Sequence, residues 1–347
     1  MKSVVLKLPP NAKFHLGEYA EDQSTALFNT ATIIHSDVLF GAFVSALSQI
    51  DEAKISAFRK YFEEGKIAFS SAFYRIEIKD KAPVYLLPKP VSINLYQLKN
   101  STKFEVKKFK KIAFISKGVW EKGISPEIWF DESGECVMPN KETVCLRSEI
   151  DDEKFELYQK VDEEKVNLTP IKEDNELYTR SVLEVLNTKV ERPQNDSEKN
   201  RKPTIQISFY FLIESHLPRE DEDFMEKVWE LVALNGIGGE RSTGCGVIEN
   251  ITFEEFNITV SEQSENKVLL GLAFPDSLQN YLYYQTKVRG GMNYGAGKRF
   301  KALTAIQESA IICGEINARI VDLGSKDRPY WKYSSILQLP LHKNYEL

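Results

Sequence analysis

The order of its patterned segments is the feature that most limits what this chain can fold into. In residues 1–260, alternating apolar residues or β-branched and aromatic runs predict four strands, and helical spacing of apolar residues predicts two helices. The strands are Lys2–Leu8, Lys66–Lys79, Thr204–Ile213 and Val247–Ile258. One helix follows the N-cap candidates Ser36 and Asp37, and the other covers Asp221–Leu234. With residues 80–203 set aside as an insertion, the order is strand, helix, strand, strand, helix, strand. This is the order of a ferredoxin-like or RRM-like domain.

The remaining residues, 261–347, are rich in strand candidates and poor in helical pattern. Strands are predicted at Lys267–Phe274, Tyr281–Val288, Ala302–Ile312 and Glu315–Val321. We therefore expect an α+β protein with tandem ferredoxin-like (RRM-like) domains. Residues 1–260 form the first, with a long insertion at about 80–203, and residues 261–347 form a second, degenerate RRM-like domain. A chain of 347 residues is long enough for both.

The net charge of −6 disfavours nucleic acid slightly, but the charges are unevenly distributed. Residues 149–176 are acidic, whereas residues 99–111 and 287–301 are rich in Lys and Arg. This layout is typical of a protein that binds RNA on one face and another protein elsewhere. The acidic stretch itself is interpreted as a solvated face or a protein-docking surface.

The sequence gives no indication of a membrane segment, a metal site or a cofactor site. No apolar run approaches the roughly 20 residues that a bilayer requires, and no signal segment is recognised. The cysteines are Cys136, Cys145, Cys245 and Cys313, and none lies at metal-binding spacing from another cysteine or a histidine. We expect free thiols, a cytoplasmic protein, no metal and no cofactor.

A glycine-rich loop, GIGGERSTGCG at residues 236–246, follows the second predicted helix. Its glycines allow positive φ and close backbone approach, so that successive amides can bind phosphate oxygens. We expect a β-branched residue at Gly239 to prevent both. A Walker loop would need Gly-Lys-Ser/Thr, and a dinucleotide-binding loop would follow a strand; a tight helix-to-strand turn is the remaining alternative. The predicted RNA contacts here are Gly236, Gly238, Gly239, Arg241, Ser242, Thr243, Gly244 and Gly246.

The loop has the pattern GGxRSxGxG, and it resembles that of the RAMP superfamily of CRISPR RNA-binding proteins. Other short motifs agree in order along the chain: FHLGE at 14–18, HSDVLF at 35–40, SSAF at 70–73, LPKP at 87–90, and GEI at 314–316 leading to Asp322. Together they resemble the fourth subunit type of the type III-A CRISPR (Csm) effector complex. Cys245 departs from the pattern, because an aliphatic residue is expected there.

The resemblance implies a two-domain RAMP protein with an inserted thumb. Such subunits hold the five-prime, repeat-derived handle of the guide RNA. They dock the large polymerase-like subunit and the adjacent RAMP backbone subunit, in antiviral defence. They are RNA holders rather than enzymes, so no catalytic residue is expected.

Three further places are candidate RNA contacts. His15 is a structural or RNA-contacting residue, or else the acid–base group of a ribonuclease. Ser36, with Asp37, is an N-cap, or lies at a helix end that binds phosphate. Arg289, Lys298 and Arg299 belong to a glycine-containing basic segment that lies on RNA or forms a solvated hairpin loop.

The thumb, by the resemblance, includes the end of the insertion. Arg180, Lys189 and Arg192 are its expected RNA contacts. Leu183, Val185 and Leu186 are expected to form an apolar wedge between nucleotides, or alternatively a helix that packs on the domain.

Two other functions remain open. One is a guide-RNA-processing endoribonuclease of the same superfamily that uses His15; the other is the equivalent subunit of a type III-B complex. The first is disfavoured because the processing enzymes carry their glycine loop near the C-terminus, whereas here it begins at residue 236 of 347.

Overall fold

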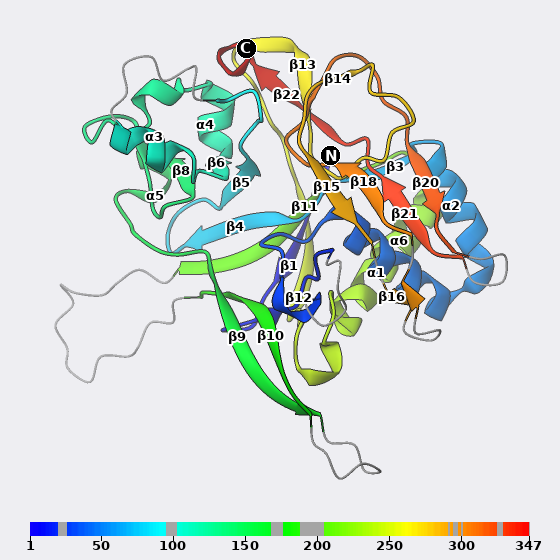
Figure 1. Ribbon diagram of the computed structural model, residues 1–347. Helices are drawn as coiled ribbons and strands as arrows, with labels where there is room; N and C mark the ends of the chain where they lie inside the picture. The colour runs from blue at the N-terminus through cyan, green and yellow to red at the C-terminus, as the bar shows by residue number, and fades with distance from the viewer. Residues whose placement is uncertain are drawn as a thin grey trace.

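The computed structural model describes residues 1–19, 26–94, 103–167, 176–187, 205–290, 292–293, 298–299, 301–324 and 329–346. Four antiparallel strands make its centre, in the order β12-β1-β11-β4 (Figure 1). Their bounds are β1 Lys2–Lys7, β4 Phe73–Ile78, β11 Ile205–Ser215 and β12 Asn250–Glu255. Helix α1 (Ser36–Ile50) lies between β1 and β4 in the chain, and α6 (Arg219–Asn235) lies between β11 and β12. The strand and helix order predicted for the first unit is confirmed.

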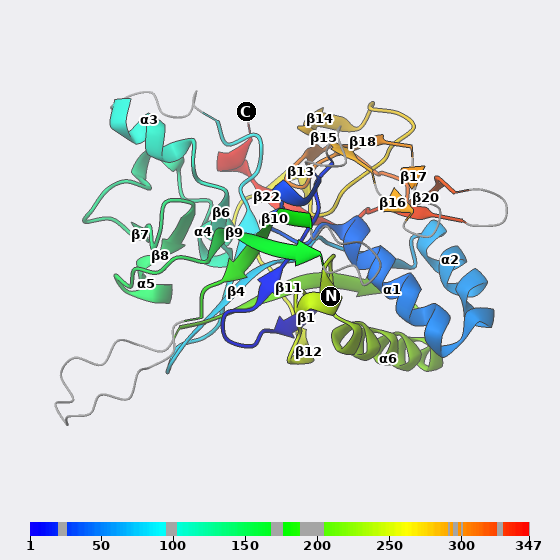
Figure 2. The same ribbon diagram turned by 60° about the horizontal axis from the view of Figure 1, so that its bottom comes forward.

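The helices cover one face of this sheet because their apolar residues recur on one side. Phe43 of α1 and Phe211 of β11 both contact Trp229 of α6, with ring centroids 5.1 and 4.6 Å apart. A helix that the sequence did not predict, α2 (Ile55–Glu63), adds Phe58 and Phe62 to the same core. Figure 2 shows α1, α2 and α6 together on this side.

The first part of the insertion extends the central sheet. Strand β5 pairs with β4, and beyond it come β6, β8 and β7. Short helices accompany them, with their apolar sides buried. The bounds are β5 Val84–Pro88, α3 Lys103–Phe109, β6 Phe114–Ser116, α4 Lys117–Lys122, β7 Cys136–Val137, β8 Thr143–Leu146 and α5 Arg147–Ile150. Strand β3 (Ile67–Phe69) precedes the insertion, within the predicted second strand, and pairs with β11. Regular elements therefore fill much of this part of the insertion, for which the sequence predicted none.

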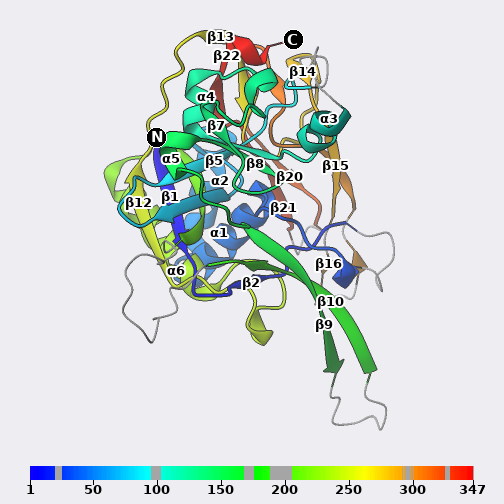
Figure 3. The same cartoon turned by 90° about the vertical axis from the view of Figure 1, so that its left-hand side faces the viewer.

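The second part of the insertion is a long hairpin. Strands β9 (Tyr158–Asn167) and β10 (Glu176–Val185) pair along their whole length, and β2 (Lys13–Phe14) joins β10 near its base. The hairpin projects from the body in Figures 1 and 3. The alternative of a helix at residues 183–186 is wrong, because Leu183 and Val185 belong to β10.

The last third of the chain is made of short strands. They are β13 Gln263–Leu269, β14 Tyr281–Tyr283, β15 Thr286–Arg289, β16 Met292–Asn293, β17 Lys298–Arg299, β18 Leu303–Ile306, β19 Ile311–Ile312, β20 Arg319–Asp322, β21 Trp331–Ser334 and β22 Gln338–His342. Within the described part of 261–346 there is no α-helix, so a second RRM-like domain is not confirmed. Each of the predicted strands is shorter than expected, and two of them are broken into pairs.

The two parts of the chain share one hydrophobic core. Tyr333 of β21 packs on Phe62 and Phe69, with ring centroids 5.1 and 5.2 Å apart, and Leu270 and Leu339 belong to the same buried cluster. The predicted boundary at 260 therefore does not separate two cores. None of the helices in the described ranges has the length and apolar character needed to cross a membrane.

Candidate nucleic-acid interface

The glycine loop is closed on itself by backbone contacts that a Cβ atom would prevent. Gly236, Gly238 and Gly246 have φ of 75°, 99° and 76°. A Cβ on Gly246 would lie 2.2 Å from the carbonyl oxygen of Ile237, and one on Gly238 would lie 2.8 Å from that of His15. These glycines are therefore required for the loop's shape, before any ligand is considered.

Gly239 has a different role from the expected one. Its φ is not in the left-handed region, and a Cβ there would lie 3.1 Å from Cδ2 of His15. The reason that we gave for substituting it, a positive φ, is wrong. Gly239 is limited by its packing on the His15 ring.

Most amides of the loop are already bonded within the protein. Those of Gly239 and Gly246 donate to the carbonyls of His15 and Lys13, at 2.9 and 2.7 Å, and hold the loop against β2. The amides of Ile237, Thr243, Gly244 and Cys245 donate to carbonyls inside the loop. The expected phosphate site along successive amides is thereby restricted to Glu240, Arg241 and Ser242. Among the described residues these three amides have no acceptor, and of the other amides in the loop the same is true only of Gly238.

These free amides lie at the start of an exposed turn, Arg241–Gly244, which we call the crest. Gly244 has φ of 90°, and a Cβ there would meet no atom within 4 Å, so it leaves open space above the backbone. Arg241 Nη1 points back to the carbonyl oxygens of Asn235 and Gly236, at 3.3 and 3.5 Å. Among the described residues the Arg241 guanidinium has no carboxylate partner, so its charge is available to an anion.

A buried arginine joins the hairpin to the crest. Arg180 of β10 is 2% exposed; its Nε and Nη2 donate to Glu163 of β9 at 3.0 and 2.8 Å, and its Nη1 donates to Glu240 at 2.9 Å and to the Thr243 hydroxyl. Lys13 Nζ lies 2.7 Å from Glu163 Oε1. Hydrogen bonding from Lys13, and then from Arg180, lowers the pKa of Glu163 to about 2.

Glu240 carries local backbone strain at this junction. It is a non-glycine residue with φ of 56°, a conformation that costs about 1–3 kcal/mol and persists only where the surroundings require it. The Arg180 contact is such a requirement, because it fixes the direction of the Glu240 side chain.

His15 lies under the loop with its ring almost fully buried. It is 6% exposed, and Nδ1 lies 2.9 Å from the carbonyl oxygen of Ser181. Because a carbonyl only accepts, Nδ1 carries the proton and donates. The ring thus connects β10 to the glycine loop. No group of three or more His, Cys, Asp or Glu side chains suited to a metal ion occurs in the described ranges.

No protein-family model matches the chain. A curated relative, "CRISPR system Cms protein Csm4" of Methanocaldococcus jannaschii, is 28% identical over 352 residues, covering 94% of this chain and 90% of the relative. The chain is a relative of Csm4. The resemblance that the sequence motifs indicated is therefore confirmed.

Solved structures of complexes that contain Csm4 include chains with the same fold. In the crystal structure of a Csm3-Csm4 subcomplex of the type III-A interference complex, the matching chain superimposes with a TM-score of 0.63 at 22% identity, covering 99% of this chain and 100% of that one. A Csm1-Csm4 cassette in complex with cA4 gives 0.56 at 18% identity, covering 99% and 98%. These matches show that the fold is shared over nearly the whole chain.

The motif at 35–40 of this Csm4 relative joins the two parts of the chain. The helix begins at Ser36, His35 takes the N-cap position without a side-chain bond, and the N-cap prediction for Ser36 is wrong. Ser36 is fully buried, and its hydroxyl accepts from the amide of Leu272 at 2.9 Å. Asp37 accepts two bonds from Arg289, at 2.9 and 3.0 Å, and one from Lys332 at 2.6 Å.

These contacts leave Ser36 and Arg289 enclosed by protein. Arg289 is 4% exposed. Although burial alone would raise it, the charges of Arg289 and Lys332 hold the pKa of Asp37 well below its ordinary value. A direct RNA contact by Ser36 or Arg289 stays a prediction, and the geometry favours a supporting role for both.

The remaining predicted contacts are only partly placed. Lys189 and Arg192 lie outside the described residues. Lys298 and Arg299 form β17, paired with β16 in a short hairpin, and their side chains are likewise not described. The prediction that Leu183 and Val185 form an apolar wedge between nucleotides is wrong, because both side chains are fully buried. The exposed apolar side chains of the hairpin are Val166 and Leu177, at 49% and 75%, which pair across β9 and β10.

Lys13, Glu163 and Glu240 were not identified from the sequence as residues of the candidate site. Glu163 belongs to the acidic stretch that we interpreted as a solvated face or a docking surface; instead it neutralises Arg180 beside the glycine loop. Glu163 pairs with Arg180 across the hairpin. This pairing could have been predicted if the sequence of β9 had shown a clear alternation of apolar and polar residues.

Proposed function

We propose that this chain is the Csm4-type subunit of a type III-A CRISPR effector complex and that its crest holds the five-prime handle of the guide RNA. The Arg241 guanidinium without a carboxylate partner, next to free amides and the open backbone at Gly244, supports this most directly. A phosphate oxygen at this place would accept from both kinds of donor. The central strands β1, β4 and β11 are almost entirely buried, so their sheet leaves the loops as the surface for RNA.

The partners of the proposed complex follow from those of its relatives. Csm4 chains occur with Csm3 in one crystal structure and with Csm1 in others. We propose that this chain likewise docks the RAMP backbone subunit and the large polymerase-like subunit, in antiviral defence in the cytoplasm. The division at residue 260 is proposed in the same way, as a boundary between two parts of the chain that share one hydrophobic core.

The test is RNA binding without cleavage. The purified chain should bind repeat-derived handle RNA and leave it intact, with or without a divalent metal. His15→Ala should change the affinity at most, because the ring connects β10 to the loop and its Nδ1 is already engaged. Site-specific cleavage by the wild type that is lost in His15→Ala would overturn the proposal in favour of the processing endoribonuclease.

The hairpin is proposed to be the thumb. Its exposed Val166 and Leu177, rather than the buried Leu183 and Val185, would insert between nucleotides. Leu177→Ser should therefore reduce the fluorescence increase of a 2-aminopurine placed in the guide next to the handle, because the base stays stacked. Leu278→Ser, at an exposed leucine in the last third of the chain that lies outside the candidate RNA-binding segments, is the control. Equal fluorescence in wild type and Leu177→Ser would contradict the thumb role.

A further inference from the structure

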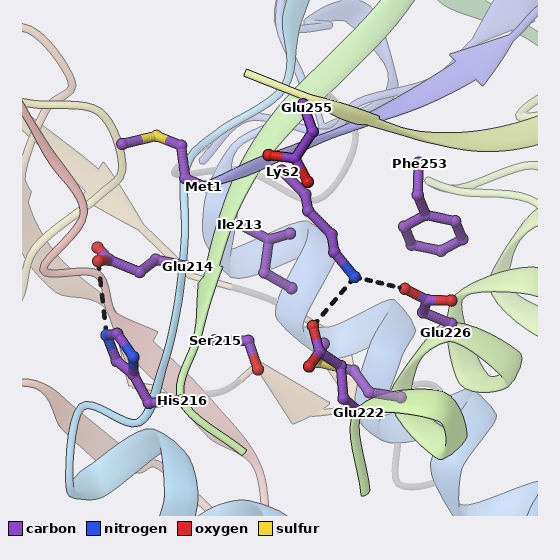
Figure 4. A pocket seen from close by; sticks show the side chains of 11 residues that line it. Met1, Lys2, Ile213, Glu214, Ser215, His216, Glu222, Glu226, Phe253 and Glu255 are labelled. Carbon is purple, nitrogen blue, oxygen red and sulfur yellow. Dashed lines mark hydrogen bonds and ion pairs between the residues drawn. The ribbon is translucent and has the colours of Figure 1, made fainter. Parts of the chain in front are cut away.

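A second surface lies at the opposite end of α6 from the crest. It is a pocket of about 240 Å³ between the start of β1, the end of β11, the first turns of α6 and β12 (Figure 4). The α6 residues that line the pocket, Glu222, Met225 and Glu226, lie 9 to 13 positions before the last residue of the helix, Asn235, which places the pocket about 14–20 Å along the helix from the start of the glycine loop. A ligand in this pocket is thus separate from an RNA bound at the crest.

The pocket combines an apolar floor with a rim of carboxylates. Ile213, Met225 and Phe253 line the floor, and the rim carries Glu214, Glu222, Glu226 and Glu255. Lys2 Nζ lies 3.0 Å from Glu222 and 2.9 Å from Glu226, while Glu214 pairs with His216 at 3.5 Å (Figure 4).

Two groups at the pocket are left without a partner. Glu255 is exposed, and it has no ion-pair partner among the described residues. Ser215 lines the same pocket, and its buried hydroxyl oxygen has no hydrogen-bond partner within the part of the chain that the structure describes. An occupant that supplies several N–H donors would pair with the exposed Glu255 carboxylate, while its apolar part covers the floor.

We propose that this pocket takes an arginine side chain from a protein partner of the complex. A guanidinium donates in several directions at once, and its aliphatic stem fits an apolar floor that includes an aromatic ring. The carboxylates exclude the phosphates of RNA by repulsion, so a protein is favoured. Lys2, seated between two of the carboxylates, shows that the rim accepts a cation. The inference rests on the proposed function, because that function supplies the protein partners.

The experiment measures the affinity of the full chain for the large subunit, for the backbone subunit and for handle RNA, each separately. Glu255→Lys should weaken binding of one of the two protein subunits at least tenfold, because it places a like charge opposite the arginine. The loss should shrink at high salt, and handle affinity should not change. Glu265→Lys, an exposed position on β13 with the same change of charge, should bind like wild type.

The outcomes separate this inference from the proposed function. If the wild-type chain binds neither subunit, the proposed function and this inference are both overturned. If the wild type binds both subunits, and folded Glu255→Lys binds them equally well, only the inference is overturned. If Glu255→Lys weakens handle RNA instead, the pocket is not a protein site.

Discussion

Arg241 is the residue on which the RNA proposal depends most. Arg241→Ala should weaken handle binding about tenfold or more, since a hydrogen bond to a charged group contributes roughly 1.5–3 kcal/mol. The slope of log affinity against log salt should fall by about one phosphate contact. Fluorescence anisotropy with labelled handle RNA at several salt concentrations measures both quantities.

The matched control is Arg219→Ala. Arg219 is exposed at the other end of α6, so its loss should leave handle affinity and salt slope unchanged. Equal effects of the two substitutions would show a general charge effect, and the crest would then not be the phosphate site.

The glycines show how one residue type serves two purposes in a single loop. Gly236, Gly238 and Gly246 allow backbone segments to approach one another, as the contacts of their missing Cβ atoms show. Gly244 has the same left-handed backbone but open space above it. Only this last glycine leaves room for a ligand.

At the scale of elements, the junction of the hairpin and the glycine loop depends on one carboxylate. The pKa of Glu163 is lowered from 4.5 to about 2 in the folded protein, first by its bond from Lys13. A lowered folded pKa means that the stabilisation is fully present above about pH 4.5 and is lost as the pH falls toward 2. Urea unfolding measured across this range should show that loss.

Glu163→Gln should flatten this part of the pH profile. The neighbouring Glu164→Gln is the control, because Glu164 points to the opposite, exposed face of β9, and its profile should match the wild type. If Glu163→Gln keeps the wild-type slope between pH 4.5 and 2, the ion pairs at this junction do not stabilise the hairpin.

At the scale of the whole molecule, the buried contacts of Asp37 connect the first helix to the last third of the chain. Asp37→Asn leaves Arg289 and Lys332 without their shared carboxylate in a buried place. Breaking such an arrangement costs about 3–5 kcal/mol, and the midpoint of urea unfolding should fall accordingly. The exposed Asp223→Asn on α6 should leave the midpoint unchanged. A loss below about 1 kcal/mol for Asp37→Asn would show that the shared core holds the two parts together without this carboxylate.

The sequence by itself determined the four central strands, the two long helices between them and the position of the glycine loop. Each of these has a strong local signal: apolar periodicity in the strands and helices, and glycines where the backbone must be left-handed. The relation to Csm4 also came from local motifs, because their order does not depend on how the chain is folded.

Only the tertiary structure decided which of the predicted residues are exposed. Ser36, Arg180 and Arg289 looked like RNA contacts because Ser and Arg bind phosphate, yet each has partners far away in the sequence, such as Leu272, Glu240 and Asp37. Burial depends on contacts between segments, and composition does not contain that information. Arg241 remained open to solvent because its side chain contacts only carbonyl oxygens at the end of α6, whereas Thr243 of the same turn accepts from Arg180. The free charge at the candidate site is therefore a property of the fold.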